Sequence, residues 1–308
     1  MKWYQIKEQA AGEKRLMLLW YIYKIFGKNI VRFITIFIAF FTFIFAKPIR
    51  KYSHKNLGII YNFTQNQSAK PTIYNCFKLI LNYAWSLIDR METFANRYPV
   101  SKLIFDSDTQ KHFMEEDIKN KRGIIFICSH IGNVEVLRTF VQQPQWSENP
   151  HVNVFLSEEQ CKIFNKFLKK IQVKTKITTY PVEQVGIETV IELEEKLNKG
   201  EVIFIAGDRV SKNTGESAVK LDFLGHKTDF PTGSFHLAQL MDASIYFISA
   251  IKNKNDRYKV YMEKFEKDNN LKKSENIALM QNKYCNFLEK IVQISPLQFY
   301  HFYEMFGE

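Results

Sequence analysis

The 308-residue sequence predicts an α/β fold, with a single mixed sheet flanked by helices and a hydrophobic N-terminal helix in front of it. Short apolar runs alternate with amphipathic helical patterns from residue 103 onward, which is typical of an α/β sheet with helices on both faces. The runs "GIIFICS" and "EVIFIAG" are continuously apolar, as in strands that are buried on both sides. Basic charge and the longest apolar run both lie in the first 60 residues. We therefore divide the chain into a basic, apolar segment at 1–60 and a domain at 61–308.

The first 60 residues combine positive charge with an apolar run. They carry eleven Lys and Arg residues against two Glu residues, which accounts for +9 of the net charge of +11. Phe33–Ala46 is a stretch of fourteen residues without a charge, and Leu16–Phe26 mixes aromatic rings with cations, as interfacial helices do. A bilayer span needs about 20 predominantly apolar residues, so the sequence leaves open whether Phe33–Ala46 crosses a membrane or lies in its interface.

The position of the basic residues indicates which partner this segment meets. Anionic headgroups attract each basic residue near a membrane surface by about 1 kcal/mol, so cations on both sides of the apolar run favour a membrane. A buried core helix flanked by solvated lysines is the alternative. Nucleic acid is not expected, because the charge accompanies an apolar run and the chain has no nucleic-acid-binding motif.

The expected elements follow the hydrophobic periodicity and the positions of Pro, Gly and capping residues. The expected helices lie at 68–98 (one or two), after residue 133 through about Val141, at 157–170, at 183–198 and at 232–241. The expected strands lie at 123–128, 152–156, 176–180, 201–207, 244–251 and 258–263, with a hairpin at 218–230 that turns near Gly225. Four scattered cysteines (Cys76, Cys128, Cys161 and Cys285) with no C-x-x-C spacing predict reduced thiols and no zinc site.

The stretch "GIIFICSHIGNVEVLR" (Gly123–Arg138) places His130 at the end of an apolar strand and Glu135 five residues later. Residues five apart differ by about 140° around an ideal helix, so the two side chains meet only if His130 precedes the helix and Glu135 lies in its first turn. Gly132 permits the tight turn and Asn133 is a plausible N-cap. Glu135 can then hold one imidazole nitrogen and leave the other as a base, with a substrate hydroxyl as nucleophile. The spacing alone is a weak pattern, since a histidine at a strand end is more often structural.

The segment H-x₄-[D/E] after an apolar strand resembles the signature of the lysophospholipid acyltransferase superfamily, and its glutamate form is similar to the branch of the lipid A secondary acyltransferases. Further blocks resemble that branch in the same order: "VIFIAGDR", "LDFLGHKTDFPTGSFHLA", "YFISAIKNKNDRYKVYME" and the closing "SPLQFYHFYEMF". The chain departs from the glycerolipid branches, which have F-P-E-G-T-R-S where this sequence has "FPTGSFH". The missing acidic residue and arginine disfavour a glycerol-3-phosphate or lysophosphatidate acceptor.

The resemblance implies a glycerolipid-acyltransferase-like fold and a membrane-associated enzyme. Such an enzyme moves a fatty acyl group from an acyl carrier protein (or CoA) thioester to a lipid or glycolipid acceptor, here a lipid A-type glycolipid. Another glycolipid, a phospholipid or a polyene-type lipid is the alternative acceptor. His130 would be the base, and Glu135 would orient it and stabilise the imidazolium. The thioester is a co-substrate, so neither a resident cofactor nor a metal is expected. The implied location is a cell inner membrane, with the catalytic domain facing the cytoplasm.

The same blocks supply candidate substrate-binding residues. The planar fork of Arg209 suits a phosphate or carboxylate, with Asp208 holding it, although Asp208 and Arg209 can equally pair with one another. Thr232, Gly233 and Ser234 open a helix, where backbone N–H groups can receive an anion or a developing oxyanion. An ordinary N-cap at Thr232 is the alternative.

A function of another class also fits the N-terminal segment. A non-catalytic peripheral module that binds membranes explains the apolar run and the charge. A module of this kind does not explain why His130 and Glu135 occur together at the end of the strand.

Overall fold

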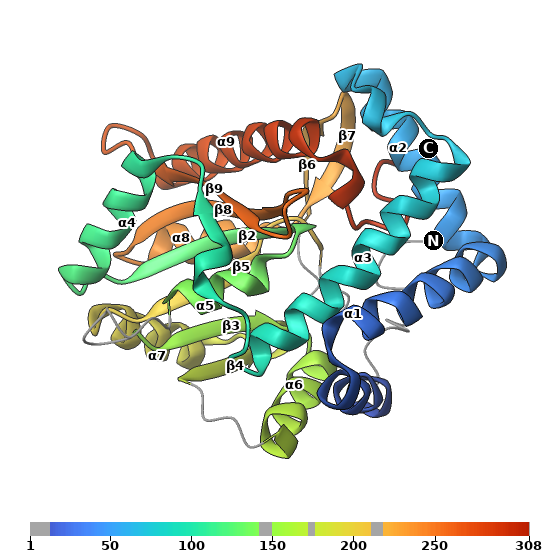
Figure 1. The fold of residues 1–308 in the computed structure, drawn as a ribbon. Helices are drawn as coiled ribbons and strands as arrows, with labels where there is room; N and C mark the ends of the chain where they lie inside the picture. Colours follow the sequence, from blue (N-terminus) through green and yellow to red (C-terminus); the bar gives the residue numbers. More distant parts are fainter. Residues whose placement is uncertain (1–12, 142–149, 172–175, 211–217, 308) are drawn as a thin grey trace.

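The computed structural model describes residues 13–141, 150–171, 176–210 and 218–307, and its centre is a seven-stranded sheet (Figure 1). The strands are arranged in the order β1-β9-β8-β2-β5-β3-β4, and all neighbours are parallel except β8 and β9. The predicted single mixed sheet is confirmed. The strands are β1 (Leu103–Phe105), β2 (Ile124–Gly132), β3 (Val152–Leu156), β4 (Ile177–Pro181), β5 (Val202–Ala206), β8 (Ser244–Lys252) and β9 (Tyr258–Phe265), and β6 (Val219–Phe223) pairs separately with β7 (His226–Phe230).

Helices flank the sheet, as expected. The described α-helices are α1 (Glu13–Phe45), α2 (Lys47–Thr64), α3 (Ile73–Phe94), α4 (Asp108–Lys119), α5 (Leu137–Val141), α6 (Glu158–Ile171), α7 (Ile187–Asn198), α8 (Gly233–Leu240) and α9 (Lys273–Ile294). Short 3₁₀ turns precede several of them, including η4 (Val134–Val136) after β2 and η5 (Val182–Gln184) before α7. The expected helix at 183–198 therefore begins at Ile187. The long helix α9 and the helix α4 were not among the expected elements.

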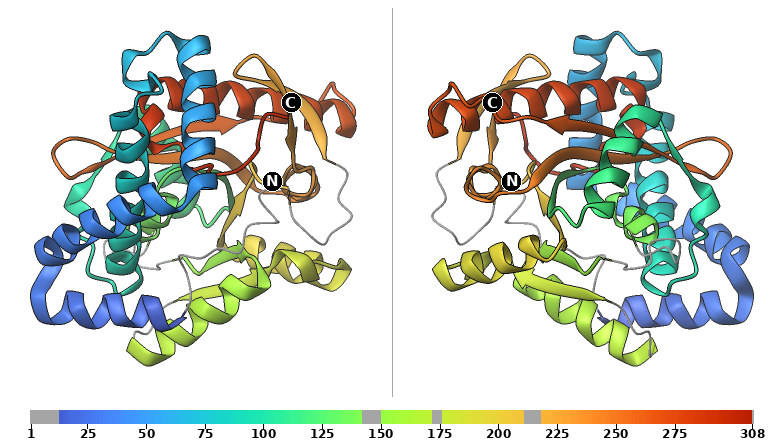
Figure 2. Two further views of the ribbon diagram at one scale, coloured as in Figure 1. Left: turned by 90° about the vertical axis from the view of Figure 1, so that its right-hand side faces the viewer. Right: turned by 90° about the vertical axis from the view of Figure 1, so that its left-hand side faces the viewer.

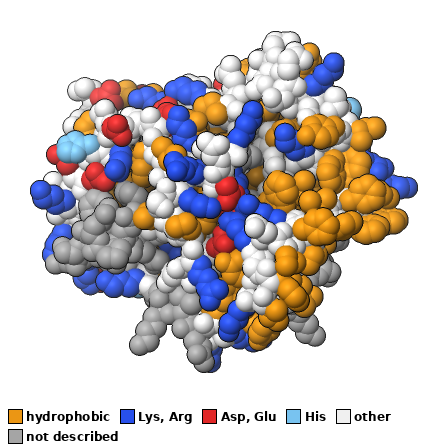
Figure 3. Space-filling view, viewed as in Figure 1, with side chains coloured by type: hydrophobic (Ala, Val, Ile, Leu, Met, Phe, Trp, Pro, Cys, Tyr) orange, Lys and Arg blue, Asp and Glu red, His pale blue; other side chains and the backbone are white. Residues whose placement is uncertain are grey.

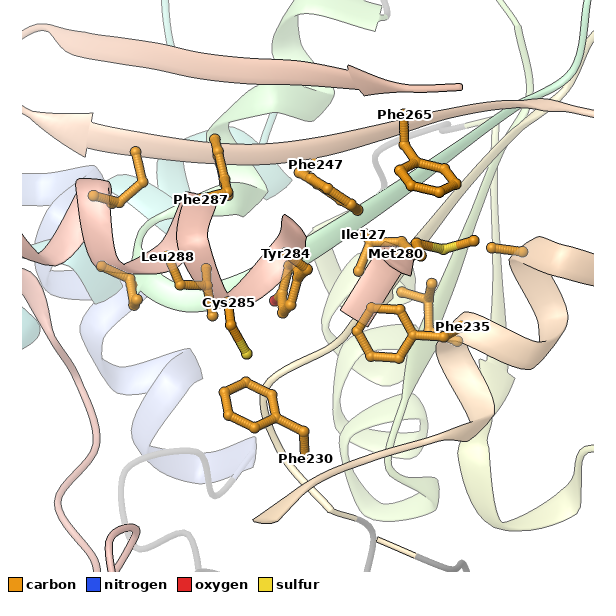
Figure 4. Close-up of a cluster of buried hydrophobic side chains, with 14 of the residues drawn as sticks. Ile127, Phe230, Phe235, Phe247, Phe265, Met280, Tyr284, Cys285, Phe287 and Leu288 are labelled. Atoms are coloured by element: carbon orange, nitrogen blue, oxygen red, sulfur yellow. The ribbon is translucent and has the colours of Figure 1, made fainter. Parts of the chain in front are cut away.

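The central strands are buried on both faces, which explains their continuous apolar sequence. Along β2, Ile125 and Ile127 belong to a core shared with α7, α8, α9 and the β6–β7 hairpin. Ile124 and Phe126 point the other way, into a second core with α4, η4 and α5. Figure 4 shows the first core, where Ile127 of β2 lies near Tyr284 of α9. Side chains alternate between faces along a strand, so one apolar run builds both cores.

The N-terminal helix bends and packs on the domain. α1 is a single element in which Gly27 has a non-helical backbone (φ 77°), and Figure 2 shows two arms on either side of this bend. Trp20 of the first arm is buried against Phe167 of α6 and Met91 of α3. By length and composition alone, Met17–Phe45 is able to cross a membrane.

The expected boundary at residue 60 falls inside α2. Leu57 and Ile60 of this helix are fully buried, and Ile60 belongs to the same core as β2 and α9. Within the described part of the first 60 residues, α2 therefore contributes to the core of the domain.

Candidate active site

The strand β2 becomes irregular where His130 lies. Its pairing with β8 runs to Cys128 and resumes at Gly132, with a shift of register between them. Gly132 has φ +78°, and a Cβ atom there would lie 2.1 Å from the carbonyl oxygen of Ala250. The tight turn assigned to Gly132 from sequence is therefore present, and only glycine fits it. Such bulges re-aim side chains and are frequent next to active sites.

The imidazole of His130 is held by Asp208, which follows β5. His130 Nδ1 lies 2.9 Å from Asp208 Oδ1, and the main-chain amide of His130 donates to Asp208 Oδ2 at 2.6 Å. Because β5 is the parallel neighbour of β2, the ends of the two strands meet at the same edge of the sheet. A carboxylate on Nδ1 assigns the proton to that nitrogen, so Nε2 carries the free lone pair. The His130 side chain keeps 35% of its surface exposed, so Nε2 is within reach of a substrate.

The Asp208 carboxylate is fully buried and remains charged. Burial raises its pKa, but the charge and hydrogen bond of His130, together with the contact from His301, outweigh burial and hold the pKa well below its usual value. A buried carboxylate of this kind stabilises an imidazolium as it forms.

A second histidine, His301, lies on the same carboxylate. Its Nε2 is 3.1 Å from Asp208 Oδ2, although the alignment is poor for a hydrogen bond, and its ring stacks on Phe299 with centroids 4.3 Å apart. Burial lowers the pKa of His301 to about 4, so this imidazole is neutral at neutral pH. His301 lies in the closing aromatic segment of the sequence, for which no catalytic role was expected. A histidine among aromatic residues was the only available signal.

The orienting contact expected from Glu135 is made by Asp208 instead. Glu135 lies in the η4 turn, as expected, but its Oε1 forms an ion pair with Arg90 of α3 at 2.7 Å. Asn133 makes no side-chain cap and donates to the carbonyl of Ser86 and to the hydroxyl of Tyr258. Asn133 occupies the N-cap position of η4, as expected, but its side-chain oxygen makes no capping bond, because the two buried partners orient the amide through its nitrogen. A role for Glu135 in catalysis stays a prediction.

The nearest side chains that carry a nucleophilic atom are not activated. Burial, with the negative charges of Asp208 and Glu135, raises the pKa of the Cys128 thiol well above its usual value, and the thiol donates to the carbonyl of Ile205. The Ser129 hydroxyl is buried and accepts a hydrogen bond from the amide of Ile131. The described residues thus bring together a partly exposed imidazole and a buried carboxylate, and the neighbouring Cys128 and Ser129 show no sign of activation.

The C-terminal segment holds Arg209. The guanidinium donates to the carbonyl of Tyr300 at 3.1 Å and lies 5.6 Å from the centre of the Tyr303 ring. Asp208 was expected to hold Arg209. The C-terminal segment holds Arg209 instead, because the Asp208 carboxylate faces His130 and His301. Arg209 thus lies one residue from the carboxylate that holds the base.

Thr232, Gly233 and Ser234 form the start of α8, as expected. Thr232 occupies the N-cap position, as the alternative expected, but its side chain makes no capping bond to α8. The Ser234 hydroxyl is buried and makes no hydrogen bond within the described part of the chain. Phe235 packs against Tyr284, whose hydroxyl donates to the carbonyl of Cys128 at 2.6 Å. The first turn of α8 is therefore joined to the end of β2 through one tyrosine.

Comparison with known proteins identifies one family. The family model of the bacterial lipid A biosynthesis acyltransferases matches residues 15–307. Curated proteins give no match. The matched range covers nearly the whole chain and includes the His130–Asp208 pair, so the chain belongs to the bacterial lipid A biosynthesis acyltransferase family.

Proposed function

We propose that this protein transfers a fatty acyl group from an acyl carrier protein thioester to a hydroxyl group of a lipid A-type glycolipid at a membrane surface. The contact of 2.9 Å between His130 Nδ1 and the buried Asp208 carboxylate carries the proposal. It supplies a base without a protein nucleophile, which suits direct transfer between two substrates.

His130 moves the proton in this reaction. Its Nε2 accepts the proton of the acceptor hydroxyl while that oxygen attacks the thioester carbonyl, and Asp208 stabilises the resulting imidazolium. A C–O bond forms and the C–S bond breaks when the tetrahedral intermediate collapses. The imidazolium returns the proton to the departing thiolate, so the thiol carrier leaves neutral and the enzyme is restored. No resident cofactor or metal takes part in these steps.

The other candidate residues bind the charged parts of the substrates. Arg209 faces a phosphate or carboxylate of the acceptor or of the phosphopantetheine arm, because its planar fork matches such groups. The amides at Thr232, Gly233 and Ser234 receive a developing oxyanion at the start of α8. Glu135 stays a candidate catalytic residue, with its carboxylate held in the ion pair with Arg90.

The partners follow from charge and hydropathy. Acyl carrier protein is acidic and docks on basic surface, with acyl-CoA as the alternative donor. The proposed location is a cell inner membrane with the domain on the cytoplasmic side, and the length and apolar composition of α1 support association with a membrane. Another glycolipid, a phospholipid or a polyene-type lipid is the alternative acceptor.

Mass spectrometry of an in vitro reaction tests the proposal. The purified full-length protein and a His130→Gln variant are each incubated with membrane lipid and with either acyl-carrier-protein thioesters or acyl-CoA. We expect one glycolipid to gain an acyl mass with the wild type only. Equal activity of the variant contradicts the mechanism. If neither protein changes any lipid with either thioester donor, the non-catalytic membrane module replaces the proposal.

A further inference from the structure

The two arms of α1 expose a continuous apolar surface. On the second arm, residues 28–45, a narrow stripe of Val31, Thr35 and Ala39 is buried against the domain. The large side chains between them point outward, and more than half of the surface of Phe33, Phe37, Ile38, Phe41 and Phe45 is exposed. Figure 3 shows hydrophobic side chains gathered on the side where Figure 1 places α1 and α2. An exposed apolar patch of this extent marks an interaction surface.

Ion pairs fasten the middle of α1 to the domain. Lys28 lies 2.8 Å from the fully buried Asp89 of α3, and Arg32 pairs with Asp89 and with Asp256 of the β8–β9 turn. Lys252 of β8 completes the neutralisation of Asp89. Pulling the helix away would leave Asp89 with only part of its counter-charge, which is costly for a buried carboxylate. The contacts therefore keep α1 on the domain.

The position of these charges is incompatible with a helix that crosses the bilayer. Lys28 and Arg32 lie near the middle of Met17–Phe45, so a spanning α1 would carry them and their acidic partners into the hydrocarbon core. The thirteen residues after Arg32, Phe33–Phe45, extend about 20 Å, whereas the core is about 30 Å thick. The arm before Gly27 is about as short. Neither apolar stretch by itself is long enough to cross the hydrocarbon core.

A basic pocket lies where the apolar surface ends. At the junction of α1 and α2 an open pocket of about 660 Å³ is lined by Lys47, Arg50, Lys51 and His54, with Phe43 and Ile73 contributing apolar walls. Arg50 is partly engaged, because it donates to the last carbonyls of α1. The pocket also contains the N-terminus of the 18-residue helix α2, where the helix dipole favours an anion. Positive charge beside exposed apolar surface matches a lipid with an anionic headgroup.

We propose that this chain is monotopic: α1 lies along one leaflet with its exposed face among the acyl chains, and the pocket formed by Lys47, Arg50, Lys51 and His54 binds the phosphate-bearing headgroup of an anionic lipid. The inference rests on the proposed membrane association and is independent of the proposed chemistry. Both ends of α1 then lie on the same side of the membrane, and the pocket sits at the depth of the headgroups.

Cysteine labelling in sealed membrane vesicles tests the orientation. All four native cysteines are buried, so the wild type gives the background. Gln5→Cys reports the segment before α1 and Lys119→Cys reports the domain. We expect a membrane-impermeant maleimide to label both variants in the same vesicle preparation without detergent. The inference is overturned if one position reacts only after detergent is added. A chain that does not sediment with membranes overturns the membrane association itself.

Vesicle flotation tests the pocket. The full-length Lys47→Gln/Lys51→Gln variant is compared with Lys119→Gln/Lys199→Gln, which removes the same charge from exposed residues of α4 and of the end of α7. Each lysine near an anionic surface contributes about 1 kcal/mol, so the pocket variant should lose about thirty-fold in affinity for phosphatidylcholine vesicles that contain phosphatidylglycerol. Its binding to phosphatidylcholine alone should not change. Equal losses in the two variants show that only net charge matters and overturn the headgroup site.

Discussion

Asp208→Asn and Glu135→Gln compare the carboxylate that holds His130 with the carboxylate that the sequence predicted to hold it. In Asp208→Asn the amide can donate to His130 Nδ1, which moves the imidazole proton to Nε2 and removes the base. The lost charge also matters: at 2.9 Å and an effective dielectric constant of about 20, a full charge on the imidazole interacts with Asp208 by about 6 kcal/mol. That energy corresponds to about 10⁴ in rate, the loss that the same exchange causes in a Ser-His-Asp triad.

Glu135→Gln should have a much smaller effect. It breaks one ion pair with Arg90, in which each side chain keeps more than a quarter of its surface exposed, and such pairs contribute about 1 kcal/mol or less. We expect the rate to fall by about ten-fold at most.

The assay is the single-turnover rate of acyl transfer from a radiolabelled donor, with circular dichroism as a control for folding. The exchange of glutamate for glutamine is the matched control, because both changes replace a carboxylate by an amide of the same shape. A larger rate loss in Glu135→Gln than in Asp208→Asn would refute the assignment of Asp208 as the group that orients the base.

Three further predictions concern stability in detergent micelles. The pKa of His301 is lowered to about 4 in the folded protein, so the unfolded state binds a proton first and stability is lost as the pH falls through 6.5 toward 4. Between pH 7 and pH 5 the free energy of unfolding, measured with urea, should fall by about 2 kcal/mol more for the wild type than for His301→Phe. Equal losses would contradict this. Asp89→Asn should reduce the free energy of unfolding by about 3 kcal/mol, because Lys28 and Lys252 lose their buried partner, whereas the exposed Asp242→Asn should change it by less than about 1 kcal/mol. Gly132→Ala should lower the melting temperature and abolish acyl transfer, since its Cβ would collide with Ala250, and an active variant of unchanged stability would show that the turn adapts.

Local patterns in the sequence predicted most of the fold. Continuous apolar runs located β2 and β5, because a strand covered on both faces needs apolar side chains at every position. The helix α9 was missed, although it covers one face of the sheet, as was the single bent α1 that replaced two expected segments. The pattern of α9 was overlooked, because its buried residues Met280, Tyr284, Leu288 and Ile291 do recur at helical spacing. The packing of the two arms of α1 on α3 and α6, in contrast, is not reported by a periodic pattern.

Local residue patterns are enough to predict that His130 lies at the end of a buried strand, that Gly132 permits a tight turn there, and that Asp208 and Arg209 follow another strand. These are properties of neighbouring residues. The carboxylate that holds the base is known only from the arrangement of the sheet, because β2 and β5 are adjacent although 78 residues separate His130 from Asp208. The tertiary structure likewise placed His301 on that carboxylate and Arg90 on Glu135. A side chain's electrostatic partner depends on distances of about 3 Å between segments far apart in the chain, and the order of the strands sets these distances.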